Sequence, residues 1–222
     1  NLLTRTLIVI LGILLIDQVL KIYIKTHYLV GETHPFLSDF LVIQFIENPG
    51  MAFGMKFGGE WGKLALTLFR IAAVIAIGWY ILKLIKKKQS SFLILSLALI
   101  FAGAFGNIID SMFYGLIFEH SAYFNPYSIA QADPASFVAF GDGYSSFLHG
   151  EVVDMLQFRA MWPGWVPGVG GDFIFPPIFN IADSAITIGV ALLIVHQLRL
   201  YRKERKGHKE PVKKDVDVVS EG

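Results

Sequence analysis

Carboxylates are the side chains of this sequence that are best suited to chemistry. The sequence contains no cysteine, which excludes a thiolate nucleophile, a cysteine zinc site and an iron–sulfur cluster. It also lacks a His-Glu-x-x-His motif, a Gly-x-Ser-x-Gly elbow and a phosphate-binding loop. Two carboxylates held close together cannot both ionise cheaply, so one keeps a proton and the other is a base. Such a pair can activate water and protonate a leaving amine, which is peptide hydrolysis.

The elements that must position these carboxylates are membrane helices. Of the 222 residues 54% are hydrophobic and 17% are charged, against roughly 25% charged in a soluble domain. Four stretches have about the 20 apolar residues that a transmembrane helix needs: 7–24, 64–82, 92–110 and 178–198. The first is not expected to be a cleaved signal peptide, because it carries Asp17 and Lys21 and no small-residue cleavage site follows.

Basic residues set the expected orientation, since lysine and arginine favour cytoplasmic loops. They follow the second and fourth spans in two groups: Lys83, Lys86, Lys87 and Lys88, then Arg199, Arg202, Lys203, Arg205 and Lys206. Segment 111–177 holds one basic residue, Arg159. We therefore expect residues 1–6, the loop 83–91 and the charged tail 199–222 in the cytoplasm, with the tail disordered beyond Gly207. Segments 25–63 and 111–177 are expected outside.

The outer segments are expected to form a small cap that contains β-strands. Residues 40–46 and 152–156 have the short apolar or alternating pattern of strands. Segment 111–177 is rich in aromatic residues, glycine and proline and has no apolar run long enough to span. Aromatic side chains favour the membrane interface, so this cap is expected to rest there.

Polar residues of the spans converge on one level, the outer edge of the bilayer. With the orientation above, six polar or acidic residues fall there, and intramembrane ionisable residues are functional candidates: Asp17, Lys21, Asn107, Asp110, Asn180 and Asp183. Asp154 lies between apolar residues of the outer segment and is expected near the same surface.

Each of these residues also has a purely structural interpretation. Asp17 and Lys21 are four apart and can form a structural ion pair. Asn107 and Asn180 can simply form hydrogen bonds between helices. The other acidic residues can be solvated, or stabilised by a helix N-terminus. Arg70, inside the second span, is expected to snorkel or pair without a catalytic role.

Five motifs, taken in order, resemble those of the lipoprotein signal peptidases, the membrane aspartyl peptidases also called signal peptidase II. They are Asp17-Gln18-x-x-Lys21, Asn48-x-Gly50-x-Ala52-Phe53-Gly54, Gly106-Asn107-x-x-Asp110, Val152-Val153-Asp154 and Phe179-Asn180-x-Ala182-Asp183. No single motif is specific for the family, but five motifs in this order, together with four spans, are specific for it.

The resemblance implies a site and a substrate. It implies that Asp154 and Asp183 are the catalytic dyad, and that the other matching residues hold the site or the substrate: Asp17, Lys21, Asn48, Gly54, Asn107, Asp110 and Asn180. The implied substrate is a prolipoprotein, cleaved before a cysteine that carries a diacylglyceryl group. Globomycin-like inhibitors, contact with membrane lipid and a monomer in the bacterial inner membrane are also implied. No metal, organic cofactor or nucleic acid is implied.

Two features depart from the family pattern. In much of the family the third motif ends Asp-Arg, whereas Ser111 follows Asp110 here. Arg159 is the replacement that the sequence suggests. The connection before Val152 is also longer than usual, with about 25–30 residues inserted over a range such as Leu116–Gly143. This insert could be a lid or a surface for substrate or partner.

Two other functions remain open from the residues alone. Intramembrane carboxylates also mark the paths of proton- or ion-coupled transporters, although these place them near the midplane, between repeats. A non-catalytic assembly subunit would tolerate substitution of both aspartates.

Overall fold

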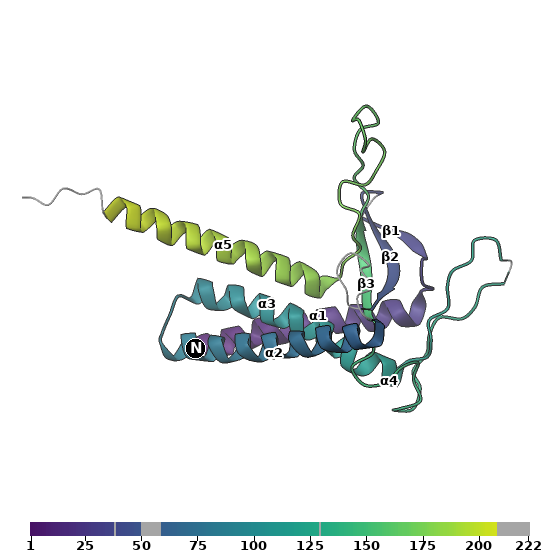
Figure 1. Cartoon of the computed structure of the whole chain (residues 1–222), viewed down its shortest axis with the longest axis horizontal. Helices are drawn as coiled ribbons and strands as arrows, with labels where there is room; N and C mark the ends of the chain where they lie inside the picture. The colour runs from purple at the N-terminus through teal and green to yellow at the C-terminus, as the bar shows by residue number, and fades with distance from the viewer. Residues whose placement is uncertain (38, 50–58, 129, 208–222) are drawn as a thin grey trace, which may run out of the picture.

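Four long helices dominate the computed structural model, which describes residues 1–37, 39–49, 59–128 and 130–207 (Figure 1). They are α1 (Leu2–His27), α2 (Gly59–Lys86), α3 (Ser91–Ile109) and α5 (Ile181–Gly207). All four are long and apolar enough to cross a membrane, which confirms the expected helical membrane fold. Each helix contains most of the corresponding predicted span. Three of them continue well past it, because the helical backbone runs on into the flanking polar and basic residues.

The third helix is the centre of the bundle. Half of its most apolar window is buried, against 17% for each of the other three, and it contacts α1, α2 and α5. Glycine permits this close approach: a Cβ on Gly103 would lie 2.2 Å from the carbonyl oxygen of Ala182 in α5. Small residues of this kind let membrane helices pack at short range. The first turn of α5 is thereby held against α3.

A three-stranded antiparallel sheet covers one end of the bundle. Its strands are β1 (Thr33–Leu37), β2 (Leu41–Asn48) and β3 (Val152–Phe158), in the order β1-β2-β3. The two predicted strands, 40–46 and 152–156, are confirmed by β2 and β3, although β2 begins one residue later, at Leu41. Asn48 pairs with Val152, so the end of β2 lies beside the start of β3.

An apolar core joins the sheet to the helices. Ile24 from α1, Phe45 from β2 and Val153 from β3 are buried together with Tyr114 and Phe118. Tyr114 ends a π-helical turn, Asp110–Tyr114, which continues α3 and leads into the short α4 (Gly115–Ile117). Such turns are frequent at functional sites. This core fixes the end of α3 against β2 and β3.

Two long excursions leave the sheet end of the molecule. The chain between α4 and β3, which includes the expected insert, runs out to one side, and residues after β3 form a second projection (Figure 1). The first is tied to the body by backbone hydrogen bonds that link Val30 with Ala122 and Phe124. Residues Met161 and Phe173 bridge the two arms of the second.

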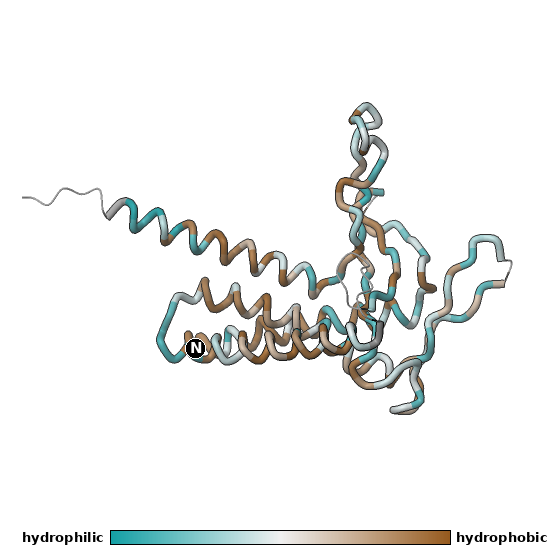
Figure 2. The backbone as a smooth tube through the Cα atoms, viewed as in Figure 1, coloured by the Kyte–Doolittle hydropathy of each residue, from teal (hydrophilic) through white to brown (hydrophobic). Residues whose placement is uncertain are grey.

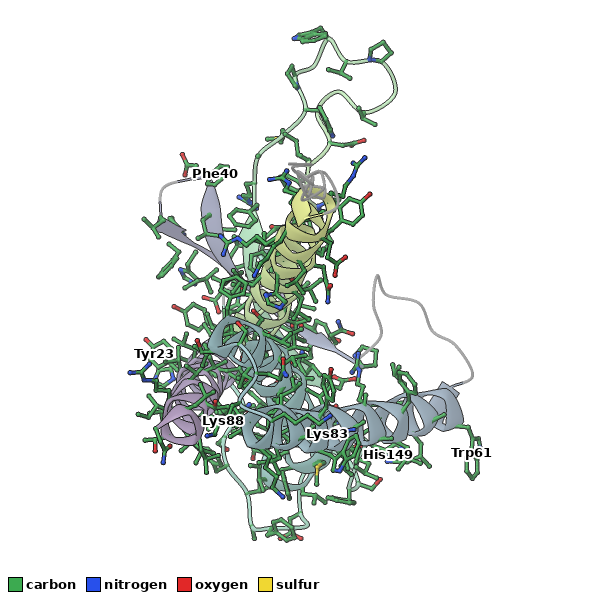
Figure 3. All side chains as sticks on the ribbon, turned by 90° about the vertical axis from the view of Figure 1, so that its left-hand side faces the viewer. Tyr23, Phe40, Trp61, Lys83, Lys88 and His149 are labelled. Carbon is green, nitrogen blue, oxygen red and sulfur yellow. The ribbon has the colours of Figure 1, made fainter. Side chains whose placement is uncertain are left out.

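The opposite end of the bundle is charged. Hydrophilic residues gather at the α2–α3 connection and along the last turns of α5, whereas the helix centres are hydrophobic (Figure 2). Lys83 and Lys88 mark this end, and Trp61 lies at the other end of α2 (Figure 3). The expected disorder of the tail beyond Gly207 concerns residues outside the described part of the chain.

Candidate active site

Asp154 occupies the middle of β3, with only 4% of its surface exposed. The structural alternative, a strand residue facing water, is therefore wrong. One carboxylate oxygen accepts a hydrogen bond from the Asn48 amide at 3.1 Å, and the other accepts one from the Asn180 amide at 2.8 Å. Asn48 reaches it because β2 and β3 are paired at this point.

Asp183 lies in the first turn of α5, where its partner Asn180 precedes the helix. The Asn180 side-chain oxygen accepts from the Asp183 backbone at 2.8 Å, and the Asp183 carboxylate accepts from the Asn180 backbone at 3.3 Å. This reciprocal arrangement is a capping box. It leaves the second Asp183 oxygen to accept from the Asn107 amide at 2.8 Å. The helix N-terminus also favours a negative charge here.

Asn180 connects the two aspartates. It is fully buried, and its amide donates to Asp154 and, at 3.0 Å, to the Asn107 oxygen. Asn107 in turn donates to Asp183. The two asparagines therefore do hydrogen bond between elements, and in doing so they hold both carboxylates.

Both carboxylates open into one pocket of about 670 Å³. This volume is in the range of small-molecule sites. Apart from the two aspartates, its lining contains both polar and apolar residues: Asn48, Arg70, Asn107, Ser184 and Thr187, then Val152, Phe158, Phe175, Pro177, Ile178, Phe179 and Ile188. The arrangement suits a ligand with a polar and an apolar part.

A buried ion cluster supports the site from behind. Lys21 lies 2.9 Å from Asp17 and 2.7 Å from Asp110, and all three side chains are fully buried. The Asp17–Lys21 ion pair was expected from the sequence. The alternative that Asp110 is a solvated surface residue is wrong, because its side chain is fully buried. Lys21 also donates to the Asn107 oxygen at 2.8 Å, so the cluster orients the amide that contacts Asp183.

Asp17 has a second role at the start of α5. Its carboxylate accepts a hydrogen bond from the backbone of Ala182 at 2.9 Å, one residue before Asp183. Gln18 braces the same cluster by donating to Asp110 at 2.9 Å. Gln18 was part of the first motif but was not singled out as a site residue, although a glutamine inside a span was a signal for it.

Burial and the negative charge of Asp183 raise the pKa of Asp154 to about 7. The hydrogen bond donated by Asn48 acts in the opposite direction, because it stabilises the ionised form. At neutral pH Asp154 therefore holds a proton in a substantial fraction of molecules. A carboxyl that is protonated near the working pH is suited to act as a general acid.

The remaining sequence-based candidates have different positions. Gly54, with most of the second motif, lies outside the described residues. Ser111 is buried and its hydroxyl donates to the Asn107 carbonyl at 3.2 Å. Arg159 is exposed and is not among the residues that line the pocket. Arg70 does line it, which sequence reasoning missed despite the signal of an arginine within a span.

No group of three or more histidine, aspartate or glutamate side chains within the described residues is arranged to hold a metal ion. The acids of the buried cluster instead surround Lys21.

Comparison with known proteins places the chain in a family. The family model described as signal peptidase (SPase) II matches residues 9–199. The lipoprotein signal peptidase of Porphyromonas gingivalis is 45% identical over 189 residues, which cover 82% of this chain and 78% of the relative. That of Amoebophilus asiaticus is 37% identical over 188 residues, or 81% and 72% of the two chains.

A solved bacterial membrane enzyme, determined in meso at 2.3 Å, has a similar structure. The TM-score is 0.59 at 26% identity, and the similarity covers 95% of each chain. The fold, the five motifs and these relatives agree that the chain belongs to the signal peptidase II family of lipoprotein signal peptidases.

Proposed function

We propose that this chain is an aspartyl endopeptidase that removes the signal peptide from prolipoproteins, with Asp154 and Asp183 as its catalytic dyad. The observation that carries the proposal is the shared pocket, in which Asn107 and Asn180 hold the two carboxylates. Membership of a peptidase family supports hydrolysis and removes the reason to consider a transporter.

The two aspartates take different parts in the proposed reaction. Asp183, ionised at the helix N-terminus, takes a proton from a water molecule that attacks the carbonyl carbon of the scissile bond. Asp154 gives its proton to the carbonyl oxygen as the tetrahedral intermediate forms. When this intermediate collapses, the carbon–nitrogen bond breaks and the leaving nitrogen receives the proton held by Asp183. The hydroxyl proton returns to Asp154, which restores the starting state.

The pocket suggests how a lipidated substrate is placed. Its apolar lining residues, such as Phe175 and Ile188, suit the hydrocarbon near the cleaved bond, and its polar lining residues suit the peptide. The proposed substrate is a diacylglyceryl-modified prolipoprotein, cleaved on the N-terminal side of the lipidated cysteine. Globomycin-like peptides are the proposed inhibitors.

The proposed location follows from charge. The basic end of the bundle would face the cytoplasm of a bacterial inner membrane, with both termini there and the pocket at the outer face. We propose that the enzyme acts as a monomer, because the described chain supplies both aspartates of the pocket by itself.

The test is cleavage of synthetic prolipoprotein peptides by the purified full chain, with products mapped by mass spectrometry. We expect cleavage immediately before the cysteine when it carries a diacylglyceryl group, and inhibition of this cleavage by globomycin. The same peptide without the lipid is the matched control and is expected to react far more slowly. Absence of cleavage of the lipidated peptide by folded protein would overturn the proposal.

A further inference from the structure

Arg70 is a charged residue deep in a membrane helix, and it reaches the candidate active site. It lies eleven residues after Gly59, the first residue of α2, which is about 16 Å along the helix. Its side chain lines the pocket together with Asn107, Asp154 and Asp183. An arginine at such a depth is costly and marks a functional position by default.

The guanidinium is the only positive charge among the described residues that line the pocket. It interacts electrostatically with the carboxylates of Asp183 and Asp154. Lys21, the other buried cation near the site, is already engaged by Asp17, Asp110 and Asn107. Any acceptor that enters the pocket therefore meets Arg70 as its cationic donor.

Arg70 is not engaged in a close ion pair with any of the described residues. Within the part of the chain that the structure describes, its guanidinium forms no ion pair within 4 Å of a carboxylate. A guanidinium has five N–H donors in a fixed planar fork and no acceptor. In a pocket whose other charged groups are carboxylates, these donors remain available to a ligand rich in acceptors.

We propose that Arg70 is a substrate-binding residue, whose guanidinium donates hydrogen bonds to carbonyl oxygens of the bound substrate next to the scissile bond. This inference rests on the proposed function, in which that ligand is a lipidated peptide. A peptide that crosses the pocket in extended form presents backbone carbonyls without partners, and the diacylglyceryl group presents two ester carbonyls. The planar fork can bind a pair of such oxygens at once. The neighbouring alternatives do not offer this: Ser111 bonds to its own helix, and Arg159 lies outside the pocket.

The experiment measures the steady-state cleavage of a lipidated prolipoprotein peptide by wild type, Arg70→Gln, Arg70→Lys and the control Arg159→Gln. We expect Arg70→Gln to raise KM about 10- to 100-fold, which corresponds to the loss of one or two charged hydrogen bonds. Arg70→Lys should recover part of this loss, because it keeps the charge but not the fork. Arg159→Gln should match wild type.

Binding without turnover separates a role in substrate affinity from a role in folding. In an Asp183→Asn background, the Kd of the same peptide should rise by a similar factor when Arg70→Gln is added, with the thermal unfolding temperature in detergent unchanged. An unchanged KM and Kd in folded Arg70→Gln would overturn the inference, and so would a change confined to the pH profile. If wild type fails to cleave the peptide at all, it is the proposed function that falls.

Two sources of carbonyl oxygen are distinguished by a substrate in which ether links replace the two esters. If Arg70 binds peptide carbonyls, the ratio of KM between Arg70→Gln and wild type stays the same for both substrates. If it binds the ester carbonyls, the ether substrate binds wild type weakly and the ratio falls towards one.

Discussion

At the scale of single residues, the site depends on two asparagines as much as on two aspartates. Asn180 donates to Asp154 and to Asn107, and its own oxygen accepts from the backbone of Asp183. One fully buried amide thus sets the positions of both carboxylates. Because transition-state geometry is sensitive to displacements of about 1 Å, removal of this amide should affect turnover more than folding.

We expect Asn180→Ala to lower kcat about 10- to 100-fold. The buried carboxyl of Asp154 loses a donor, and the first turn of α5 loses its capping side chain. The measurement is kcat on a lipidated prolipoprotein peptide, with Asn125→Ala as the control, since Asn125 lies in an exposed loop. Equal kcat values for the two variants would show that Asn180 does not position the dyad.

The pH dependence follows from the raised pKa of Asp154. In the proposed reaction, the proton that Asp154 donates is present below a pH of about 7 and is lost as the pH rises through that value. The rate should therefore fall on the alkaline side. It should also fall in acid, once the pair holds two protons and no base remains. The apparent pKa values of these two limbs are properties of the coupled pair of carboxylates and not of either residue alone.

Asn48→Ala offers a directional check on this profile, measured as kcat/KM against pH, which reports the pKa values of the free enzyme. Its amide stabilises the ionised form of Asp154, so its loss should raise the pKa and move the alkaline limb to higher pH. The control is wild type under the same conditions. A rate that stays flat from acid to alkaline pH would contradict an acid and a base in the reaction.

The sequence was informative about site residues wherever a polar residue lies within an apolar stretch. Asp17, Lys21 and Asp110 stood out because charge inside a span is costly, and the structure brings them together. The position of Arg70 in the pocket lining was not predicted, because an arginine that snorkels and one that lines a pocket look the same in sequence. The side to which a long side chain points depends on the packing of α2 against α3, which one helix does not encode.

At the scale of elements, the site is assembled by four segments. The end of β2 supplies Asn48, β3 supplies Asp154, the end of α3 supplies Asn107, and the start of α5 supplies Asp183. The apolar runs predicted the helices, and the alternating pattern predicted β2 and β3. β1 and the register of the sheet were not predicted, because a strand of five residues that mixes polar and apolar side chains, with none of them buried, carries little pattern.

A second buried lysine fastens the expected insert to the rest of the cap. Lys25 in α1 pairs with Glu47 of β2, donates to Ser121 at 2.8 Å, and lies over the rings of Phe118 and Tyr144. The insert is therefore not a simple lid that could be removed without effect. Its first part contributes to the core, and Glu47 is next to the site residue Asn48.

We expect Lys25→Met to destabilise the protein by about 3–5 kcal/mol, the usual cost of leaving one member of a buried ion pair uncompensated. Thermal unfolding in detergent measures this. Lys87→Met, at an exposed position in the α2–α3 connection, is the matched control and should unfold as wild type does. An equal unfolding temperature for both variants would mean that Lys25 does not hold the cap together.

At the scale of the whole molecule, charge and apolar surface are separated along the bundle axis. Large apolar side chains are exposed along the helices, such as Leu11, Leu15 and Ile75, as lipid-facing surfaces require. Hydrophilic residues, among them the lysines of the α2–α3 connection, gather at one end (Figure 2), and the pocket lies at the other. The net charge of +1 results because the positive charge of one end is nearly cancelled by the negative charge of the other. This separation could be predicted from sequence, whereas the paths of the two long loops could not, because they lack periodicity.

The natural absence of cysteine allows the orientation to be measured directly. A single cysteine introduced by Asp142→Cys, at an exposed position of the cap, should react with a membrane-impermeant maleimide in spheroplasts. Lys87→Cys should react only after the membrane is opened. The reverse pattern would show that the pocket faces the cytoplasm.

The central claim is that Asp154 and Asp183 together perform the hydrolysis. The most direct test is the kcat of Asp154→Asn and Asp183→Asn on a diacylglyceryl-modified prolipoprotein peptide, with Asp142→Asn as the control and folding checked by thermal unfolding. We predict that each dyad variant loses about 10²–10⁴-fold in kcat, the range for general acid–base groups, while the control keeps the wild-type rate. Cleavage at the wild-type rate by either folded dyad variant would contradict the claim.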